Sequence, residues 1–267
     1  MPQALRLVTI NTGKGDGAYR RRIDLLIAGL KRLEPDIILL QEALATASGT
    51  MDTTADLAAG LCLPATYAPA RTKSRNVEGE WLLCSSGLGA LSNLPLLETD
   101  RLPLPCDPAD GERVAQLLVF DWSGQSLLVV NLHLSHLHSR DDLRQNQLRA
   151  LFAHPWFERE WQVRIVAGDF NTRPDELPAL FDAAGAWGWK DGYATGDEFR
   201  ATIPVDAPPG EGFCVDYIVS LVRHPADHPE FRNAAIVLTE PTDGVYPSDH
   251  RGVMVDLIRS EESPVGA

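Results

Sequence analysis

The sequence predicts a layered α/β fold built as a single domain. The chain has 267 residues, of which 44% are hydrophobic, so it can bury a large core without a second domain. Short apolar segments of strand type alternate with segments of helical period, a pattern typical of helices packed in layers on β-sheets. Two halves of this kind fit a β-sandwich flanked by helices. We expect the domain to cover residues 1–260 and residues 261–267 to form a loose C-terminal tail.

The first half of the chain predicts a strand, a helix, a strand, a helix and a strand. These elements are expected at residues 5–10, 20–34, 36–40, 52–61 and 65–70. The first helix carries apolar residues at a helical period and should end before Pro35. Residues 71–80 are polar and rich in turn formers, and we interpret them as a solvated loop. The alternative is that its basic residues Arg71, Lys73 and Arg75 lie over a functional face.

The second half supplies further strands and two helices. Strands are expected at residues 82–91, 114–120, 127–131, 163–167, 215–219, 234–238 and 253–258. Helices are expected at residues 140–152 and 176–184. Residues 102–110 form a Pro-rich connection, and residues 121–125 are typical of a hairpin turn between two strands.

One strand end concentrates polar groups. The apolar run at residues 163–167 leads into Gly168-Asp169-Phe170-Asn171. Because alternate residues of an extended segment point the same way, Asp169 and Asn171 should share a face while Phe170 packs inward. Gly168 lets the backbone turn. Taken alone, the pattern fits an ordinary Asx-type turn after a buried strand equally well.

Other apolar runs are also bounded by polar groups. In chain order these groups are Asn11, Gln41-Glu42, Asn131-Leu132-His133, Asp216-Tyr217-Ile218 and Ser248-Asp249-His250. Together with Gly168-Asp169-Phe170-Asn171, the ordered set resembles the endonuclease/exonuclease/phosphatase superfamily. This superfamily includes pancreatic-type deoxyribonucleases, abasic-site endonucleases, neutral sphingomyelinases and inositol polyphosphate 5-phosphatases. The resemblance covers residues 5–258.

The resemblance implies a four-layer α-β-β-α sandwich in which two packed mixed β-sheets are flanked by helices. It also implies an enzyme that hydrolyses phosphoesters with Mg²⁺, or with Mn²⁺ as the alternative metal. Such hydrolysis requires that charge on the phosphoryl oxygens be neutralised, for which hard oxygen ligands and a divalent cation are suited. Glu42, which ends a very apolar run, is the leading metal ligand, with Asn11 beside it. Asp249 is expected to assist the metal directly or through water.

The remaining motif residues are expected to carry the chemistry. By resemblance, Asp169 orients or deprotonates the attacking water and Asn171 holds a phosphate oxygen, with a second metal site as the alternative role for Asp169. His250 acts on the phosphate or the water, and Asp216 is the carboxylate that holds its ring in one tautomer. His133 acts as general acid or oxyanion stabiliser facing the leaving group. Which histidine is acid and which is base stays open.

Several residues have weaker assignments. Arg113 could clamp a phosphate as a bidentate donor or could be an ordinary surface arginine. His136 and His138 are expected in a solvated loop at the mouth of the site, although His-x-x-His-x-His could hold zinc. Gly13 stands where abasic-site endonucleases carry an acidic residue, which weakens a role in DNA repair. We interpret residues 13–17 as a flexible connector.

Composition and charge limit the kinds of partner and the cellular location that we expect for this chain. The net charge of −13 opposes long-range attraction of polyanions, but a bound divalent cation would invert the field locally. Four scattered cysteines indicate thiols, without a zinc or disulfide framework. With no signal segment and no transmembrane segment, we expect a cytoplasmic monomer. The leading function is a phosphodiesterase or nuclease. The alternatives are a phosphatase or phospholipase C-like enzyme on a small or lipid phosphoester, and a non-catalytic binding protein on the same fold.

Overall fold

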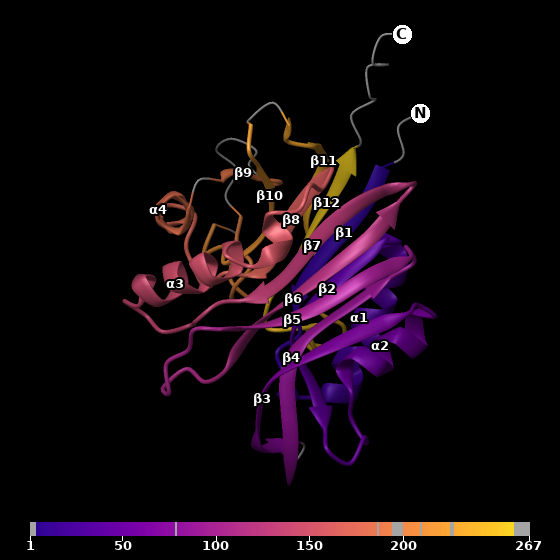
Figure 1. The fold of residues 1–267 in the computed structure, drawn as a ribbon. Coiled ribbons are helices and arrows are strands. Elements are labelled where there is room, and N and C mark those ends of the chain that lie inside the picture. Colours follow the sequence, from indigo (N-terminus) through magenta and orange to yellow (C-terminus); the bar gives the residue numbers. More distant parts are fainter. Residues whose placement is uncertain are drawn as a thin grey trace.

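The computed structural model describes residues 4–77, 79–185, 187–193, 200–208, 210–224 and 227–258. Within them, two six-stranded sheets pack face to face, and helices cover the outer face of each sheet (Figure 1). The predicted α-β-β-α sandwich of two mixed sheets is therefore confirmed. The predicted tail at residues 261–267 lies outside the described residues.

The first sheet joins the two ends of the chain. Its strands lie in the order β11-β12-β1-β2-β4-β3. Their bounds are β1 Ala4–Asn11, β2 Ile37–Thr46, β3 Ala65–Val77, β4 Glu80–Ser92, β11 Glu230–Val237 and β12 Gly252–Ile258. β1 pairs in parallel with β2 and antiparallel with β12. This arrangement brings Asn11, at the end of β1, close to the segment that precedes β12.

The second sheet has the order β5-β6-β7-β8-β10-β9. Its strands are β5 Leu96–Leu104, β6 Arg113–Trp122, β7 Gln125–His133, β8 Val163–Asp169, β9 Gly188–Asp191 and β10 Asp216–Val222. β7 and β8 run in parallel, and their register places His133 beside Asp169. β10 lies antiparallel to β8, with Asp216 beside Asp169. Three of the predicted site residues therefore lie side by side, His133 and Asp169 at the ends of β7 and β8 and Asp216 at the start of the antiparallel β10.

Four helices complete the layers within the described residues. They are α1 Tyr19–Leu33, α2 Thr53–Leu61, α3 Asp141–Phe152 and α4 Leu177–Ala184, and a short 3-10 helix, η1, covers Pro155–Phe157. α1 ends at Leu33 because Glu34 adopts a left-handed conformation, and its N–H donates to the carbonyl of Leu30. Asp52 caps α2 by accepting a hydrogen bond from the backbone N–H of Ala55 at 2.9 Å. No helix of the described part is long and apolar enough to span a bilayer.

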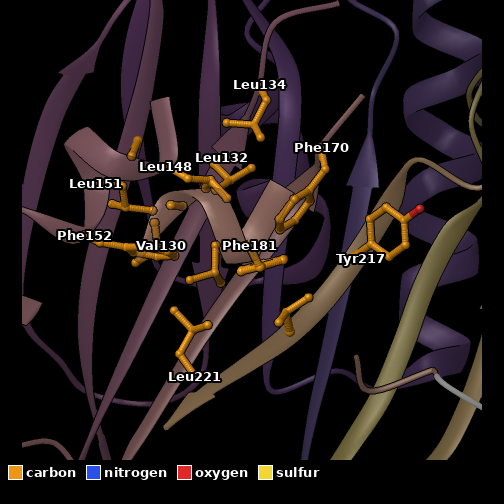
Figure 2. Close-up of a cluster of buried hydrophobic side chains, with 14 of the residues drawn as sticks. Val130, Leu132, Leu134, Leu148, Leu151, Phe152, Phe170, Phe181, Tyr217 and Leu221 are labelled. Carbon is orange, nitrogen blue, oxygen red and sulfur yellow. The ribbon is translucent and has the colours of Figure 1, made fainter. Parts of the chain in front are cut away.

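The core forms three layers because neighbouring strand residues face opposite sides. Val129 packs between the two sheets, whereas Val130 packs under α3 and α4. Figure 2 shows that outer layer, in which Phe170 from the turn after β8 meets Phe181 of α4 and Tyr217 of β10. The inward packing predicted for Phe170 is confirmed, since its side chain is fully buried. Strands buried on both faces explain why the sequence contains continuous apolar runs.

The predicted hairpin turn at residues 121–125 is also confirmed. Trp122 of β6 pairs with Gln125 of β7, which leaves two residues in the turn. Both of these residues, Ser123 and Gly124, have positive φ, at 54° and 82°. Two positive φ values are the geometry of the type I′ turn, whose twist matches that of the flanking strands.

Some expectations about edge strands were wrong. Residues 71–77, which we interpreted as a solvated loop, continue β3 and pair with β4 down to Val77. β5, at residues 96–104, runs into the predicted Pro-rich connection, and β9 was not predicted at all. β3, β5 and β9 each lie at the edge of a sheet. Edge strands expose much of their surface, so they need not show the apolar alternation by which strands are recognised.

Candidate active site

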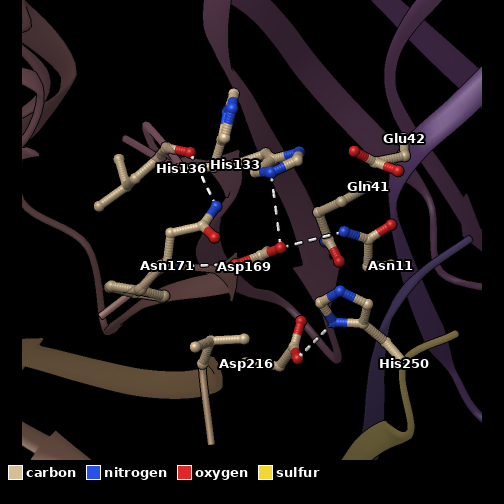
Figure 3. A network of polar contacts seen from close by, with 12 residues as sticks. Asn11, Gln41, Glu42, His133, His136, Asp169, Asn171, Asp216 and His250 are labelled. Atoms are coloured by element: carbon tan, nitrogen blue, oxygen red, sulfur yellow. Dashed lines mark hydrogen bonds and ion pairs between the residues drawn. The ribbon is translucent and has the colours of Figure 1, made fainter. Parts of the chain in front are cut away.

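A polar cleft lies where the two sheets meet at one edge of the sandwich. Its volume is about 350 Å³. Figure 3 shows most of the predicted residues gathered there from both sheets, with Asp169 between His133 and His250. The first sheet and its loops supply Asn11, Glu42, Asp249 and His250, and the second supplies His133, Asp169, Asn171 and Arg113. Asp216 lies behind them against His250. The structure therefore brings all nine predicted residues to one place.

Asp169 is at the centre of this arrangement. Its Oδ2 atom accepts a hydrogen bond from Nδ2 of Asn11 at 3.0 Å and lies 3.4 Å from Nε2 of His133. Its Oδ1 atom accepts the backbone N–H of Asn171 at 2.9 Å. Burial, and next the negative charge of Asp216, raise the pKa of Asp169 to about 7. Its carboxyl group can therefore change protonation state near neutral pH.

The backbone beside Asp169 requires glycine. Gly168 has φ +134°, and a Cβ placed there would lie 2.0 Å from the carbonyl oxygen of Leu132 on β7. The missing side chain lets β8 approach β7 closely just before His133 and Asp169 pair. Asn171 follows in a left-handed conformation, with φ 48°, and its Nδ2 donates to the carbonyl of Leu134 at 3.1 Å. The turn thus holds Asn171 at the cleft.

His250 and Asp216 form a buried pair. Nδ1 of His250 lies 2.9 Å from Oδ2 of Asp216. Burial alone would lower the pKa of His250, but the charges of Asp216, Asp169 and Asp249 and the hydrogen bond with Asp216 raise it to about 10. Oδ1 of Asp216 is buried with no hydrogen-bond partner among the described residues. The ring is therefore a cation at neutral pH, oriented by one carboxylate.

His133 is in the opposite electrostatic state. Burial, followed by the positive charges of Arg113 and Lys14, lowers its pKa well below the ordinary value. The cleft therefore contains one neutral and one charged imidazole, on either side of Asp169 (Figure 3). Two histidines with opposed protonation states can serve different proton-transfer roles at one pH.

Glu42 owes its position to a β-bulge. The register between β2 and β4 shifts between Leu40 and Ala43, and Glu42 has φ 54°. The bulge re-aims the strand so that Glu42 lines the cleft, and β2 then continues to Thr46 instead of ending at Leu40 as predicted. Nζ of Lys14 makes an ion pair with the Glu42 carboxylate. A positive charge is thus accommodated beside this residue.

Asn11 and Asp249 complete a set of oxygen donors with Glu42. Oδ1 of Asn11 accepts the backbone N–H of Gly13 at 3.0 Å, and Oδ1 of Asp249 accepts the Ser248 hydroxyl at 3.1 Å. All three side chains line the cleft. Two carboxylates and an amide oxygen are the hard donors that Mg²⁺ and Mn²⁺ take, so the residues present fit such an ion. The chain also places a buried cluster of ligand atoms from Asp169, Asp216 and His250 within 4.8 Å of one another.

The two sheets are tied together beneath the site by motif residues. Nε2 of Gln41 donates to Oδ1 of Asn131 at 2.7 Å, which joins β2 to β7 across the interior. Nδ2 of Asn131 in turn donates to the carbonyls of Leu40 and Gly89, at 3.1 Å and 2.9 Å. Both side chains are fully buried. A satisfied buried network of this kind fixes the relative position of the two sheets.

The first residues of the glycine-rich segment 13–17, which we interpreted as a flexible connector, are held by hydrogen bonds. Arg22 of α1 donates to the carbonyls of Thr12, Gly13 and Lys14 at 3.0, 3.2 and 2.8 Å. A Cβ at Gly13 would lie 2.5 Å from Oδ1 of Asp249. The segment therefore packs on the site and delivers Lys14 to Glu42. Sequence reasoning missed Lys14, because nothing in its local pattern distinguishes it from a loop lysine.

Arg113 lines the cleft, but its guanidinium group is already paired. It donates to Asp110 at 2.5 Å and 3.1 Å, and its Nη2 lies 2.9 Å from Nδ1 of His136. His136 also contacts Asp110, and His138 is exposed away from the lining residues. The described residues do not bring these histidines into a three-residue metal cluster.

The basic residues of β3 lie on the cleft. Arg71, Lys73 and Arg75 all line it, although we had placed them in a solvated loop. The structure agrees with the alternative interpretation, in which these residues lie over a functional face. The signal was present in the sequence as three cations at alternate positions, which is a strand pattern.

Comparisons with known proteins agree with the fold. A family model described as "Endonuclease/Exonuclease/phosphatase family" matches residues 8–250. Among solved structures, an endonuclease/exonuclease/phosphatase family protein from Leptotrichia buccalis C-1013-b aligns with a TM-score of 0.72 at 15% identity, covering 95% of this chain and 99% of that one. D. rerio TDP2, complexed with single strand DNA product, aligns with a TM-score of 0.71 at 18% identity, covering 96% and 100%.

A third solved structure, the endonuclease/exonuclease/phosphatase from Bacteroides vulgatus, aligns with a TM-score of 0.71 at 19% identity. The alignment covers 96% of this chain and 98% of that one. At such identities the likeness to these structures shows a shared fold alone. No curated protein sequence matches the chain.

Proposed function

Because the chain belongs to the endonuclease/exonuclease/phosphatase family, we propose that it is a Mg²⁺-dependent phosphodiesterase that cleaves nucleic-acid strands. Family membership supports phosphoester hydrolysis as the reaction. The observation that carries the proposal is the single cleft in which a central carboxyl group, Asp169, lies between a neutral His133 and a positively charged His250.

The oxygen donors at one side of the cleft are the proposed metal ligands. Glu42, Asn11 and Asp249 would hold Mg²⁺, with Mn²⁺ as the alternative. The bound ion would neutralise charge on the phosphoryl oxygens. Ser248 supports this side, because its hydroxyl bonds Asp249 at 3.1 Å and the Asn11 carbonyl at 2.5 Å. The donors are therefore held in place by the chain itself.

Asp169 is the proposed base. A carboxyl group with a pKa of about 7 can accept a proton from a water molecule at neutral pH. The water oxygen forms a bond to phosphorus, the ester P–O bond breaks, and the water proton passes to Asp169. Asn11 and the backbone N–H of Asn171 hold the Asp169 carboxylate in place through its two oxygens. Nδ2 of Asn171 has a second N–H available for a phosphate oxygen.

The two histidines take different roles in this proposal. His250 is charged and bonded to Asp216 through Nδ1, and its Nε2–H has no hydrogen-bond partner among the described residues. This N–H can therefore donate to a phosphate oxygen and stabilise its developing charge. His133 lies 3.4 Å from Asp169 on the other side. From there it faces the leaving group and, as a neutral ring, donates a hydrogen bond to the departing oxygen, which takes its proton from solvent. Asp216 touches His250 and does not line the cleft, so it acts as a positioning residue.

The choice of substrate rests on a solved relative. D. rerio TDP2 has the same fold and was crystallised with single strand DNA product, which makes a nucleic-acid strand the first substrate to test here. A small or lipid phosphoester is the alternative within the same chemistry. The alternative to an enzyme is a non-catalytic binding protein on the same fold.

The test is hydrolysis by purified wild type, Glu42→Ala and His250→Ala. The panel contains single-stranded and duplex DNA, RNA, bis-p-nitrophenyl phosphate, sphingomyelin and inositol phosphates, each with Mg²⁺ or a chelator. We expect metal-dependent cleavage of a nucleic acid that both variants lose while remaining folded by circular dichroism. Asp182→Ala, an exposed carboxylate on α4, is the matched control and should retain activity. Metal-dependent activity retained by both site variants would contradict the site assignment, and turnover only of a lipid or inositol phosphate would change the substrate class.

A further inference from the structure

The edge strand β3 places a row of cations on the cleft. Arg71, Lys73 and Arg75 are alternate residues of this strand and all line the cleft. Alternate residues of a strand point the same way and lie roughly 6.6 Å apart. The three side chains, which we name the β3 cation row, therefore lie one after another along the cleft that also contains Asp169 and Asn171. The reaction proposed above uses none of them.

The β3 cation row is poorly neutralised by the protein. Among the described residues, neither Lys73 nor Arg75 has a carboxylate at ion-pairing distance. Nη2 of Arg75 donates to the Ser86 hydroxyl at 3.3 Å, and its Nε–H is buried without a partner in the described structure. Arg71 donates to the backbone carbonyl of Asp110 at 2.8 Å and lies 3.8 Å from Glu112. A buried N–H without a partner costs stability unless a ligand satisfies it.

Like charges crowd one another in this row. The charge of Arg75 is the main cause that lowers the pKa of Lys73, followed by burial and the charges of Arg71 and Lys14. The exposed Asp16, which also lines the cleft, only partly offsets them. A chain with a net charge of −13 has many carboxylates that could have been placed beside this row. Among the described residues, none of these carboxylates lies at ion-pairing distance of Lys73 or Arg75. The two cations are therefore available to an anionic ligand.

We propose that the β3 cation row binds the phosphates next to the scissile one in a single-stranded nucleic acid. This inference rests on the proposed function for the position of the scissile phosphate. A line of cations suits a linear series of phosphates, whereas an isolated phosphate or a lipid headgroup with one phosphate would leave the outer cations unpaired. Proteins that bind single strands without sequence preference use such a positively charged groove along the backbone.

Binding in the absence of turnover tests this directly. We would measure fluorescence anisotropy of a short fluorescein-labelled oligothymidylate, with chelator present, across a series of salt concentrations. Each phosphate contact contributes roughly −0.7 to the slope of log affinity against log salt for single strands. The variant Lys73→Gln/Arg75→Gln should therefore have a slope less negative by roughly 1.4 and a weaker affinity at low salt. Oligouridylate run in parallel shows whether the strand preferred is DNA or RNA.

The control and the kinetic comparison separate this proposal from its premise. Lys31→Gln removes one exposed charge on α1, outside the cleft, and should leave affinity and slope unchanged. For turnover, the double variant should lose more kcat/KM on oligothymidylate than on the p-nitrophenyl ester of thymidine 5′-phosphate, which has one phosphate. A slope equal to that of Lys31→Gln, or equal losses on both substrates, would overturn the subsite. If wild type cleaves neither substrate, the proposed function fails while the salt series still decides whether the row binds phosphates.

Discussion

Nδ1 of His250 lies 2.9 Å from Oδ2 of Asp216, and the two residues belong to different sheets. Asp216 begins β10 in the second sheet, and His250 lies two residues before β12 of the first. The pair therefore forms only when the sheets pack in their native relation. It makes the chemistry of the cleft depend on the packing of the whole sandwich.

Replacing Asp216 with asparagine should impair the reaction more than substrate binding. The amide cannot stabilise a positively charged His250 ring, so we expect kcat to fall by roughly 10²–10⁴-fold. KM should change little, because Asp216 is fully buried and does not line the cleft. Steady-state kinetics on the substrate found in the panel measures both constants. Asp191→Asn, which removes another buried carboxylate paired with Arg200, is the control and should keep kcat near wild type. An equal loss in the two variants would mean that Asp216 is needed only for folding.

Removing the charge of Lys14 should tighten metal binding in the absence of substrate. Its ammonium group pairs with Glu42, the proposed metal ligand, and must share or leave that carboxylate when a divalent ion binds. A unit charge at contact distance in water is worth about 1 kcal/mol, or roughly fivefold in Kd. We expect Lys14→Gln to lower the Kd for Mn²⁺ by about this factor, as measured by electron paramagnetic resonance of free Mn²⁺. Lys31→Gln is the control for net charge, and a Kd change no larger than the control's would argue against metal binding at Glu42.

Alanine at position 168 should destabilise the fold severely. Its Cβ would meet the Leu132 carbonyl oxygen at 2.0 Å, and φ +134° is strained for any L side chain. We expect a loss of about 3 kcal/mol or more in the free energy of unfolding, measured by urea denaturation. Gly124→Ala is the matched control, because φ is +82° there but no atom lies within 4 Å of the added Cβ. That variant should lose only about 1 kcal/mol. Similar losses in the two variants would show that backbone strain alone, and not the contact with β7, requires glycine at 168.

The ion pair between Arg6 and Asp256 should contribute a pH-dependent part of the stability. The two residues face each other on β1 and β12 and form bonds of 2.7 Å and 3.0 Å. Burial alone would raise the pKa of Asp256, but hydrogen bonds from Arg6 and Asn233 outweigh it and hold the pKa below its ordinary value of 3.8. A lowered folded-state pKa means stabilisation that is fully present above the unfolded-state value and is lost as pH falls through the folded-state one.

We therefore expect Asp256→Asn to destabilise the protein by about 1–3 kcal/mol at pH 7. The difference in the free energy of unfolding between wild type and variant should become smaller as the pH falls below 3.8. Urea denaturation at a series of pH values checks this. If this difference stayed constant down to the pH at which the protein unfolds in acid, the charge of the Asp256 carboxylate would contribute nothing to stability.

Strands of the interior were predictable from sequence because they are buried on both faces. β2 and β7, for example, each contain a continuous run of four apolar residues, Ile37–Leu40 and Leu127–Val130. The edge strands β5 and β9 contain no such run and were missed, and the polar half of β3 was taken for a loop. At an edge, hydrogen bonds to one neighbour hold the strand, and this pairing leaves no trace in local hydrophobicity.

The candidate site shows the same division. His133, Asp169 and His250 were found because each stands at the boundary of a strand within a recognisable motif. Lys14 and Asp110 were not found, because their roles come from contacts with Glu42 and with Arg113 that join separate segments. Arg113 was named as a phosphate clamp, yet its donors are directed at Asp110.

The class of fold and the chemical types gathered at the strand ends could be predicted from the amino-acid sequence. Burial of apolar strands and the order of Asn, Glu, His and Asp along the chain depend on local pattern alone. The protonation states of the two histidines, the direction of the Glu42 side chain and the position of the β3 cation row could not be predicted in this way. Those properties follow from burial, from charges brought together across two sheets and from a bulge in β2, none of which exists before the sheets pack.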